Sequence, residues 1–479
     1  MNVREVLHIV GALLVWTAIA MVPPMVLGIF EGYGLHWLLV VSVTASVGCV
    51  IWFLTPRDVS INRREGVAIV GLGWLAVVAM GSLPFIVSGV APTVASALFE
   101  SASGFTTTGA TVFAVIEDLP KSILLWRSIT HWMGGMGIIV LGVAILPLIG
   151  MGGAQLFRAE VPGIAADRLK PRVATTARLL WGVYALLTTT LAIVYLLLGM
   201  SLFDAVNHAM SAMATGGFST RTASVGAFSP AIQWVTIVFM LAAGTNFTLH
   251  YQALTGRWFS WFRDSEFRWY AGVILAAVVA VFVFLGISGA GWIFRRAAFN
   301  VVSIATTTGF ATADFSAWPA FCQVLLLGLM FVGAMGGSTG GGFKTARAVV
   351  VLKHAVSEVQ KVLHPNAVFV TKLGRSPIRS EILANVLAYL ALYVATHGIG
   401  SLLIAALGYD LLTSVSAALA AMSSIGPGLG DVGPVSHYGD LSSTAHVILS
   451  GLMLLGRLEF YTLLVLVIPG TWGHWGGER

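Results

Sequence analysis

The stretch "SIATTTGFAT" at residues 303–312 decides the fold predicted for this chain. It places threonine and serine hydroxyls around Gly309, between two apolar segments, in a 479-residue sequence that is 57% hydrophobic and only 10% charged. Soluble globular proteins of this length carry less apolar content. A polar segment with a glycine inside so apolar a chain therefore needs a structural reason.

Long apolar runs on both sides of this stretch predict an all-α polytopic membrane protein. A bilayer core of about 30 Å requires roughly 20 apolar residues per helix. Runs of suitable length occupy residues 6–30, 66–90, 179–200, 270–286 and 382–408. Because backbone groups in lipid must be satisfied within the segment, these runs are predicted to be helices.

Three further stretches are similar to the opening one. They are "SASGFTTTGATVF" (101–113), "MSAMATGGFSTR" (210–221) and "AAMSSIGPGLGD" (420–431), and their glycines align with Gly309 at Gly109, Gly217 and Gly426. Each follows a stretch too short to span a membrane, so each unit is predicted to comprise a helix, a pore half-helix, a polar filter strand and a second helix. Irregular backbone at membrane depth must be buried in protein or line a water-filled cavity. We therefore expect the four strands of this pseudo-fourfold repeat to meet at one axis.

The repeat divides the chain into five predicted segments. They are an N-terminal transmembrane helix pair (1–60), pore repeat one (61–150), pore repeat two (151–256), pore repeat three with an intramembrane loop (257–375) and pore repeat four (376–479). Two helices in each repeat, added to the N-terminal pair, predict ten full crossings and four half-helices.

The distribution of basic residues predicts the orientation. They cluster in segments 1–5, 55–65, 155–178, 257–268 and 344–379, which the positive-inside rule assigns to the cytoplasm together with the N-terminus. The net charge of +6 thus reflects topology and gives no reason to expect nucleic-acid binding. The basic connections 157–178 and 353–380 suit docking of a cytosolic regulator or of anionic lipid, or simple solvation.

The aligned stretches have the chemistry of a cation filter. A ring of backbone carbonyls can replace the hydration shell of potassium, glycine can turn its carbonyl without steric penalty, and the C-terminal ends of the half-helices favour a cation. One Thr-rich bend is usually a packing kink, but four at matching positions favour a pore. The predicted potassium-filter residues, called the filter segments below, are Thr106, Thr107, Thr108 and Gly109; Ala214, Thr215, Gly216 and Gly217; Thr306, Thr307, Thr308 and Gly309; and Ser423, Ser424, Ile425 and Gly426. No other metal site is expected.

Several polar side chains lie near the predicted filter. Glu100, His208 and Asn300 each precede their filter glycine by nine residues and are expected to hydrogen-bond the filter scaffold. His131 is a candidate proton site or a packed histidine, and its neighbouring glycines suit close helix packing.

The segment "GAMGGSTGGGFKTAR" (333–347) interrupts the expected second helix of repeat three. Glycine costs roughly 1 kcal/mol relative to alanine within a helix, so this glycine-rich segment is predicted to unwind. It lacks the lysine spacing and the strand and helix context of a nucleotide-binding phosphate loop. A polar loop at this depth must instead face protein or water.

Arg457 lies inside the apolar run 447–470. An arginine near the middle of a membrane helix costs about 2.5–3.5 kcal/mol on insertion scales, so it should face the bundle interior or a cavity. It is either a charge in the pore or half of a structural ion pair, for instance with Glu459.

These motifs, with "GGSTGGGFKTAR" and "LLGRLEFYTLL", resemble the TrkH/KtrB group of the potassium transporter superfamily, which also includes plant HKT proteins. The likeness covers essentially the whole chain, and the initial helix pair resembles the TrkH branch. It implies a homodimer in the bacterial inner (plasma) membrane, surrounded by membrane lipid, and a TrkA-type cytosolic nucleotide-binding regulatory ring. Nucleotide is then expected only on that partner, with no cofactor bound to this chain.

The resemblance also implies roles for individual residues. The gating loop would comprise Gly336, Gly337, Ser338, Thr339, Gly340, Gly341, Gly342 and Lys344, and would obstruct the pore beneath the filter. Arg457 would be the pore barrier. Two features concern selectivity: each repeat has one aligned glycine where the TVGYG filter has two, and none has the serine that accompanies sodium preference in HKT proteins.

The predicted function is potassium uptake through a gated, channel-like pore. The alternative is a symporter that couples potassium to sodium or protons. Coupled carriers usually bury carboxylates at the midplane, and this chain has few beyond Glu100, Asp204 and Glu459, which favours the pore. An enzyme, such as an intramembrane serine protease, is not expected, because it has no use for four aligned filters.

Overall fold

The computed structural model describes residues 2–55, 63–144, 169–289, 294–367, 369–374, 376–460, 462–463 and 466. Over these ranges the chain is helical apart from turns, loops and one antiparallel hairpin of β1 (Lys372–Leu373) and β2 (Ser376–Pro377). The all-α prediction is confirmed. The predicted segment boundaries at residues 60, 150 and 375, and much of the basic connection 157–178, lie outside the described residues.

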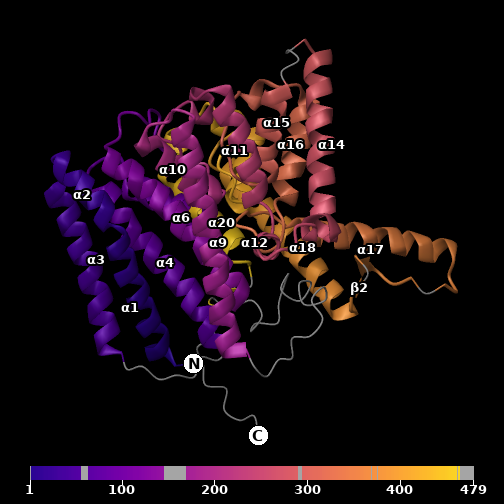
Figure 1. Ribbon diagram of the computed structural model, residues 1–479, viewed down its shortest axis with the longest axis horizontal. Helices are drawn as coiled ribbons and strands as arrows, with labels where there is room; N and C mark the ends of the chain where they lie inside the picture. Colours follow the sequence, from indigo (N-terminus) through magenta and orange to yellow (C-terminus); the bar gives the residue numbers. More distant parts are fainter. Residues whose placement is uncertain are drawn as a thin grey trace, which may run out of the picture.

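The N-terminal helices lie along one edge of the molecule (Figure 1). They are α1 (Val3–Ala20), α2 (Val22–Phe30) and α3 (Gly34–Leu54). Two prolines in the first turn of α2 divide it from α1, because proline has no N–H to continue the hydrogen-bond ladder. A Cβ atom on Gly11 would lie 2.9 Å from the Gly48 carbonyl oxygen. Glycine therefore allows α1 and α3 to pack closely.

The remaining helices follow a repeated order. Each unit begins with a long helix: α4 (Arg63–Val87), α9 (Leu169–Leu197), α14 (Ser265–Ile287) or α18 (Ser380–Ala405). A short helix follows: α5 (Val94–Phe105), α10 (Leu202–Met213), α15 (Phe294–Ala305) or α19 (Leu411–Met422). After the filter segment come α6 (Lys121–Ala144), α11 (Pro230–Ala243) with α12 (Phe247–Leu254), α16 (Ala320–Val332) with α17 (Thr345–Leu363), or α20 (Ser443–Arg457). The described residues also form five short helices: η2 (Ser224–Ala227), α13 (Ser260–Arg263), η3 (Phe315–Ala317), η4 (Gly430–Val432) and η5 (Tyr438–Asp440).

The four short helices have the properties predicted for pore half-helices. Each has 12 residues, about 18 Å at 1.5 Å per residue, which is too short for a bilayer core. Three begin with a side-chain cap, from Thr93, Ser201 and Asp410, whose oxygens accept main-chain N–H groups of the first turn. Such caps fix where a helix starts.

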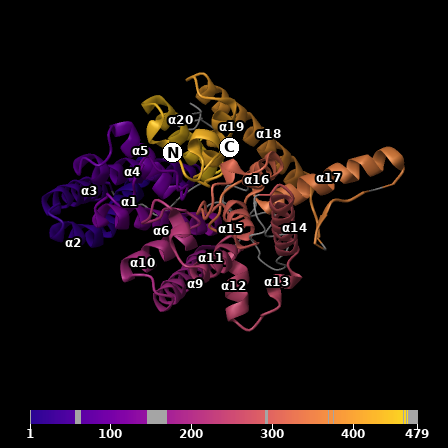
Figure 2. The ribbon, with the colours of Figure 1, turned by 90° about the horizontal axis from the view of Figure 1, so that it is seen from above.

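The repeats are arranged in a closed circle (Figure 2). The second helix of each repeat packs against the half-helix of the next: α6 on α10, α11 on α15, α16 on α19, and α20 on α5. The last contact joins repeat four to repeat one. This arrangement brings the ends of all four half-helices to the centre of the molecule.

The described residues show fewer unbroken apolar helices than the ten crossings that the sequence predicts, because the second helices of the repeats are interrupted or short where they are described. Over the described residues, six helical segments are long and apolar enough to cross a membrane, or seven if the bent pair α11 and α12 is counted as one span. That pair bends by 101°, α16 stops at Val332, and α20 stops at Arg457. The first helices of the repeats are therefore whole, whereas three of the second helices are broken or short.

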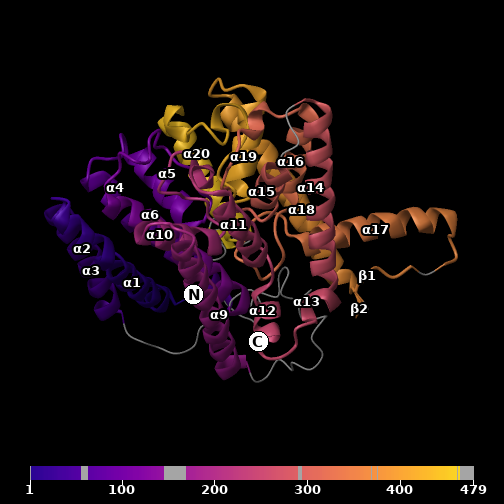
Figure 3. The same ribbon diagram turned by 45° about the horizontal axis from the view of Figure 1, so that its top comes forward.

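Helix α17 projects sideways from the bundle and leads to the β1–β2 hairpin (Figures 1 and 3). It starts where the glycine-rich segment of repeat three ends. Its outer half exposes Val359, Val362 and Leu363.

Candidate functional site

The four filter segments share one backbone conformation. In each, the aligned glycine and the residue two positions before it lie in the left-handed region. The glycine φ angles are 82° at Gly109, 85° at Gly217, 79° at Gly309 and 95° at Gly426, and the others are 53° at Thr107, 53° at Thr215, 58° at Thr307 and 54° at Ser424. Non-glycine residues rarely adopt this region. Four such residues at one aligned position indicate a repeated structure.

The filter segments also close their half-helices in the same way. In repeat one, Thr107 N donates to Gly104 O at 3.0 Å and Thr108 N donates to Ser103 O at 2.8 Å. Equivalent pairs of bonds start from Thr215 and Gly216, from Thr307 and Thr308, and from Ser424 and Ile425. The four filter segments thus have the same main-chain geometry although their side chains differ.

The four segments form a ring. At each aligned glycine, an added Cβ atom would collide with the carbonyl oxygen of the residue that precedes the next repeat's glycine. The distances are 1.9 Å from Gly109 to Gly216 O, 2.4 Å from Gly217 to Thr308 O, 1.8 Å from Gly309 to Ile425 O and 2.7 Å from Gly426 to Thr108 O. Since real Cβ atoms do not approach so closely, only glycine fits. The contacts run from repeat one through two, three and four back to one.

Apart from the hydroxyl of Ser423, which lies 2.6 Å from that of Tyr393, the hydroxyls of the filter segments fall into two groups. Thr106 and Thr108 hydrogen-bond each other at 2.8 Å, as do Thr306 and Thr308, so these hydroxyls brace their own strands. The second group lies two positions before each glycine, where all four repeats carry a hydroxyl: Thr107, Thr215, Thr307 and Ser424. Within the described part of the chain, the buried hydroxyls of Thr107 and Ser424 make no hydrogen bond.

Repeat two replaces a threonine with Gly216, and His131 from repeat one fills that space. A Cβ atom on Gly216 would lie 2.2 Å from His131 Nδ1, and the imidazole stacks on Phe218 with ring centroids 4.0 Å apart. Its Nδ1 is 3.1 Å from Ser211 Oγ. These contacts favour the packed histidine over a proton site.

A polar side chain on each half-helix braces the strand beyond the glycine. Glu100 Oε2 accepts from Val112 N at 3.0 Å, and Asn300 Oδ1 accepts from Thr312 N at 3.3 Å. His208 Nε2 is 2.9 Å from Ser219 Oγ. The contribution of Glu100, His208 and Asn300 to the scaffold is therefore confirmed. In repeat four, Ser416 has this function, because its hydroxyl bonds both the N–H and the carbonyl of Leu429 at 2.9 Å.

Two carboxylates on the half-helices, Glu100 and Asp204, are paired with arginines. Arg127 Nε donates to Glu100 Oε1 at 2.7 Å, and both side chains are almost fully buried. Arg221 contacts Asp204 at 2.9 Å, and the Arg127 guanidinium lies 4.0 Å from the centroid of the Phe218 ring. A buried ion pair of this kind fixes geometry rather than adding much stability.

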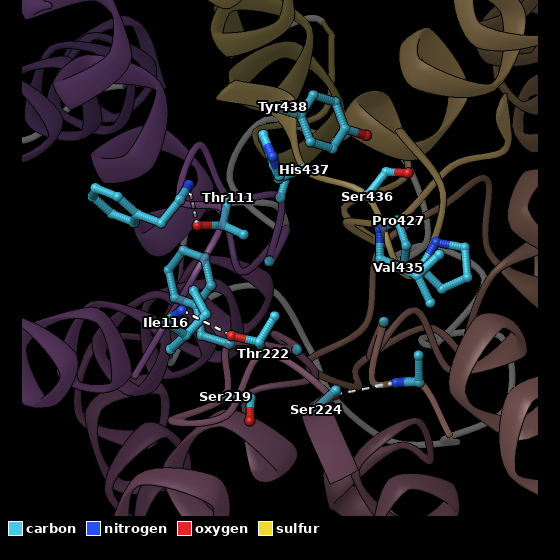
Figure 4. A pocket seen from close by; sticks show the side chains of 18 of the residues that line it. Thr111, Ile116, Ser219, Thr222, Ser224, Pro427, Val435, Ser436, His437 and Tyr438 are labelled. Atoms are coloured by element: carbon cyan, nitrogen blue, oxygen red, sulfur yellow. Dashed lines mark hydrogen bonds between the residues drawn. The ribbon is translucent and has the colours of Figure 1, made fainter. Parts of the chain in front are cut away.

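A cavity of about 100 Å³ lies next to the ring, and Gly109, Gly217, Gly309 and Pro427 are among the residues that line it. Residues of all four repeats line it, and Figure 4 labels those of repeats one, two and four. Its rim joins neighbouring repeats: Ile116 N donates to Thr222 Oγ1 at 2.9 Å, and Ala311 N donates to Ser224 Oγ at 3.2 Å. Tyr438 also donates its hydroxyl to Gly426 O at 2.7 Å.

The glycine-rich segment of repeat three lies against the opposite side of the ring. It contains no helix between Val332 and Thr345. Gly341 N donates to Thr307 Oγ1 at 2.7 Å, and a Cβ atom on Gly341 would lie 2.1 Å from Ser423 O. Thr339 Oγ1 donates to Met213 O at 3.0 Å. The loop therefore contacts residues at or just after the C-terminal ends of the half-helices of repeats two, three and four.

Two cationic side chains, Arg457 and the loop's own Lys344, bond to carbonyl oxygens of this loop. Arg457, the last residue of α20, donates from Nη1 to Thr339 O at 2.8 Å, and Lys344 Nζ donates to Gly340 O. In the described residues, Nε and Nη2 of Arg457 have no hydrogen-bond partner although they are buried. The alternative ion pair between Arg457 and Glu459 is wrong, because Glu459 pairs with Arg347 at 2.8 Å.

Three features of the site are not predicted by the sequence. The break between α11 and α12 falls at a single glycine, Gly244, which gives a weak signal in sequence. Ser416 lies one position out of register with Glu100 and Asn300. Glu266, near the start of α14, accepts hydrogen bonds from Gly336 in the loop and from Ala346 just after it. For Glu266, the sequence shows only an acidic residue at the edge of an apolar run, which does not indicate a contact with the loop.

Comparisons with known proteins agree on one family. The sequence profile of TrkH, described as a cation transport protein, matches residues 38–471. The chain is 40% identical to the Trk system potassium uptake protein TrkH of Halomonas elongata, over 98% of this chain and 100% of that protein. It is also 40% identical to the protein of the same name from Escherichia coli K12, with the same coverage. The crystal structure of the potassium transporter TrkH from Vibrio parahaemolyticus superposes with a TM-score of 0.91 at 37% identity, over 99% of this chain and 100% of that one.

Proposed function

Because this chain belongs to the TrkH family of cation transport proteins, we propose that it takes up potassium across the bacterial inner membrane through a channel-like pore. The observation that carries the proposal is the closed ring of four filter segments. The relatives are named as potassium uptake proteins, which agrees with it.

The chemistry of the ring supports potassium as the substrate. Potassium exchanges its hydration shell for carbonyl oxygens in such filters, and the four half-helices end beside the ring, where their partly negative C-termini favour a cation. The hydroxyls of Thr107, Thr215, Thr307 and Ser424 would add oxygens at the inner mouth. With one aligned glycine in each repeat, we expect fewer carbonyl sites than in a TVGYG filter, and weaker exclusion of sodium.

The loop 336–344 would act as the gate. Its hydrogen bonds to Thr307, Met213 and Arg457 support a closed position across the inner end of the pore. The Arg457 charge beneath the ring would shorten the residence of a cation and thus limit leakage. To conduct, the loop must release these contacts.

The arrangement of carboxylates favours a pore over coupled symport. A coupling site needs a carboxylate able to bind the second ion, yet Glu100 and Glu459 each pair closely with an arginine. Asp204 contacts both Arg221 and Thr220.

The proposal includes the wider assembly. We expect a homodimer in the lipid bilayer, with the N-terminus in the cytoplasm and a TrkA-type ring docked on the cytoplasmic face. The names of the relatives as parts of a Trk system support a regulatory partner. Nucleotide would bind that ring, and this chain would carry potassium without a cofactor of its own.

Purified protein in liposomes tests the proposal. We expect potassium uptake driven by the potassium gradient and membrane potential alone, with no sodium or proton gradient. Uptake that strictly requires a second ion gradient would establish symport instead. An absence of potassium flux under both conditions would reject the proposed function.

A further inference from the structure

Glu266 holds both ends of the loop with one carboxylate oxygen. It lies in the first turn of α14 and is buried. Its Oε1 accepts from Gly336 N at 2.8 Å and from Ala346 N at 3.1 Å. Gly336 stands at the start of the loop, and Ala346 is the second residue of α17, directly after it.

We propose that Glu266 is the clamp that holds the loop in its closed position. It is a positioning residue that acts through the loop and does not bind the transported ion. The inference rests on the proposed function, because it takes the loop to be the gate.

The loop backbone needs such a clamp. Gly333, Gly337, Gly342 and Lys344 all have positive φ angles between 68° and 80°, and glycine gives a chain access to many alternative conformations. A hydrogen bond to a charged acceptor is roughly twice as strong as one between neutral groups. One carboxylate bonded to both ends therefore selects the conformation that places Thr339 and Gly341 against the ring.

The loop also contacts repeat two through main-chain hydrogen bonds between uncharged groups. Met335 N donates to Gly244 O at 3.1 Å, and Phe247 N donates to Gly337 O at 3.1 Å. These bonds join main-chain groups and exist at one end of the loop. Glu266 differs because it links the loop entrance to the helix that leaves it.

The position of Glu266 also offers a route for regulation from the cytoplasm. Asp264, two residues earlier, caps α14 by accepting from Phe267 N at 2.7 Å. Immediately before it lie α13 and the basic segment that begins at Arg257. A displacement of this segment that moves the start of α14 would move both anchored ends of the loop together.

The test compares three full-length variants in liposomes without any regulator. Glu266→Ala removes both hydrogen bonds, and we expect potassium flux to rise by about tenfold or more, because the closed state loses two charge-assisted bonds. Glu266→Gln keeps an acceptor oxygen in the same place, and flux should stay within about threefold of the parent.

Asp264→Ala is the matched control. In the described part of the chain, the hydrogen bonds of Asp264 go to Ser260, Trp261, Phe267 and Arg268, and none reaches the loop. Flux should remain within about twofold of the parent. An equal rise in Asp264→Ala and Glu266→Ala would overturn the clamp, since both would then act by loosening α14.

Two readouts separate a clamp from general damage. The ratio of potassium to sodium permeability should be unchanged in Glu266→Ala, because the ring is untouched; a collapsed ratio would contradict the inference. In a second assay, a cysteine introduced by Ser338→Cys, in protein carrying Cys49→Ala, should react faster with a thiol reagent when Glu266 is alanine. An unchanged reaction rate together with unchanged flux would also overturn it.

Failure of the clamp can be distinguished from failure of the gate. Thr339→Ala removes the loop's hydrogen bonds to Met213 O and Ala243 O without altering Glu266. If Thr339→Ala raises flux and Glu266→Ala does not, the loop is the gate and the clamp is wrong. If neither changes flux, the gating role in the proposed function fails as well.

Discussion

Repeats one and three carry the same filter sequence but different second helices. Thr106–Thr108 and Thr306–Thr308 precede glycines with nearly equal φ angles, 82° and 79°. In repeat one, α6 then runs unbroken for 24 residues, whereas in repeat three the helix stops at Val332 and resumes only at Thr345. The filter conformation is thus local to its own segment. The chain could change one second helix into a loop without disturbing the ring.

The second helix of repeat two is bent, so it is intermediate between the unbroken helix of repeat one and the interrupted helix of repeat three. It also forms hydrogen bonds with the loop. Its second helix breaks at Gly244, where α11 and α12 bend by 101°. The break exposes main-chain groups of Gly244 and Phe247, which bond the loop at Met335 and Gly337. The interrupted second helix of repeat three therefore bonds to the interrupted second helix of repeat two. The repeats differ most on the side of the ring where the loop lies.

The largest effect should come from breaking the ring itself. Gly309→Ser places a Cβ atom 1.8 Å from Ile425 O, so the ring must deform, and we expect sodium permeability relative to potassium to rise by about tenfold or more. Gly328→Ser, in α16 of the same repeat, is the control, because nothing lies within 4 Å of its Cβ position. Reversal potentials in planar bilayers measure the ratio. An unchanged ratio in Gly309→Ser would count against the filter assignment.

A smaller effect should follow removal of the charge beneath the ring. Arg457→Gln removes the positive charge and weakens the bond to Thr339 O, so we expect potassium flux to increase about fivefold, because a cation then meets a lower barrier. Lys361→Gln, at an exposed site paired with Glu358, should leave flux unchanged. Tracer flux into liposomes gives both values. A decrease in Arg457→Gln would make Arg457 a structural support instead.

The comparison of repeats one and three can be tested at equivalent threonines. Thr307→Val removes the hydroxyl that accepts from Gly341 N and should raise flux without a regulator about threefold, since the loop loses one hydrogen bond. Thr107→Val changes the same filter position in repeat one, where α6 continues without a loop, and should not open the pore. Equal increases in the two variants would show that the loop is not held through Thr307.

The smallest effect should come from the braces behind the filter. Asn300→Ala removes two hydrogen bonds to Thr312 and should lower the free energy of unfolding by about 1–2 kcal/mol. Ser416→Ala removes the equivalent brace to Leu429 and should cost a similar amount. Thermal unfolding in detergent measures both. A large loss in one variant with none in the other would mean that the braces are not equivalent parts of one repeat.

The sequence predicted the features that depend on residue type and spacing. Four aligned glycines indicated four equivalent backbone positions, because only glycine tolerates the close approach now seen at Gly109 and Gly309. The density of glycine between residues 333 and 342 likewise indicated an interrupted helix. Both depend on local properties of the chain.

Features that depend on contacts between repeats were harder to predict. Sequence alone gave no sign that His131 fills the space left by Gly216, or that Arg347 and not Arg457 pairs with Glu459. All four repeats carry a hydroxyl two positions before the aligned glycine, at Thr107, Thr215, Thr307 and Ser424. This match is hard to see in the sequence because the adjacent filter residues differ from repeat to repeat. The positive φ angle that these four residues share shows that their positions are structurally equivalent.

The most direct test of the central claim is to locate the ion in the ring. Crystals grown in rubidium, an anomalous scatterer that substitutes for potassium, should show density on the axis beside the carbonyl oxygens of Thr108, Gly216, Thr308 and Ile425. That density should disappear in Gly309→Ser and persist in Gly328→Ser. Ordered rubidium away from the ring, with none on its axis, would contradict the account.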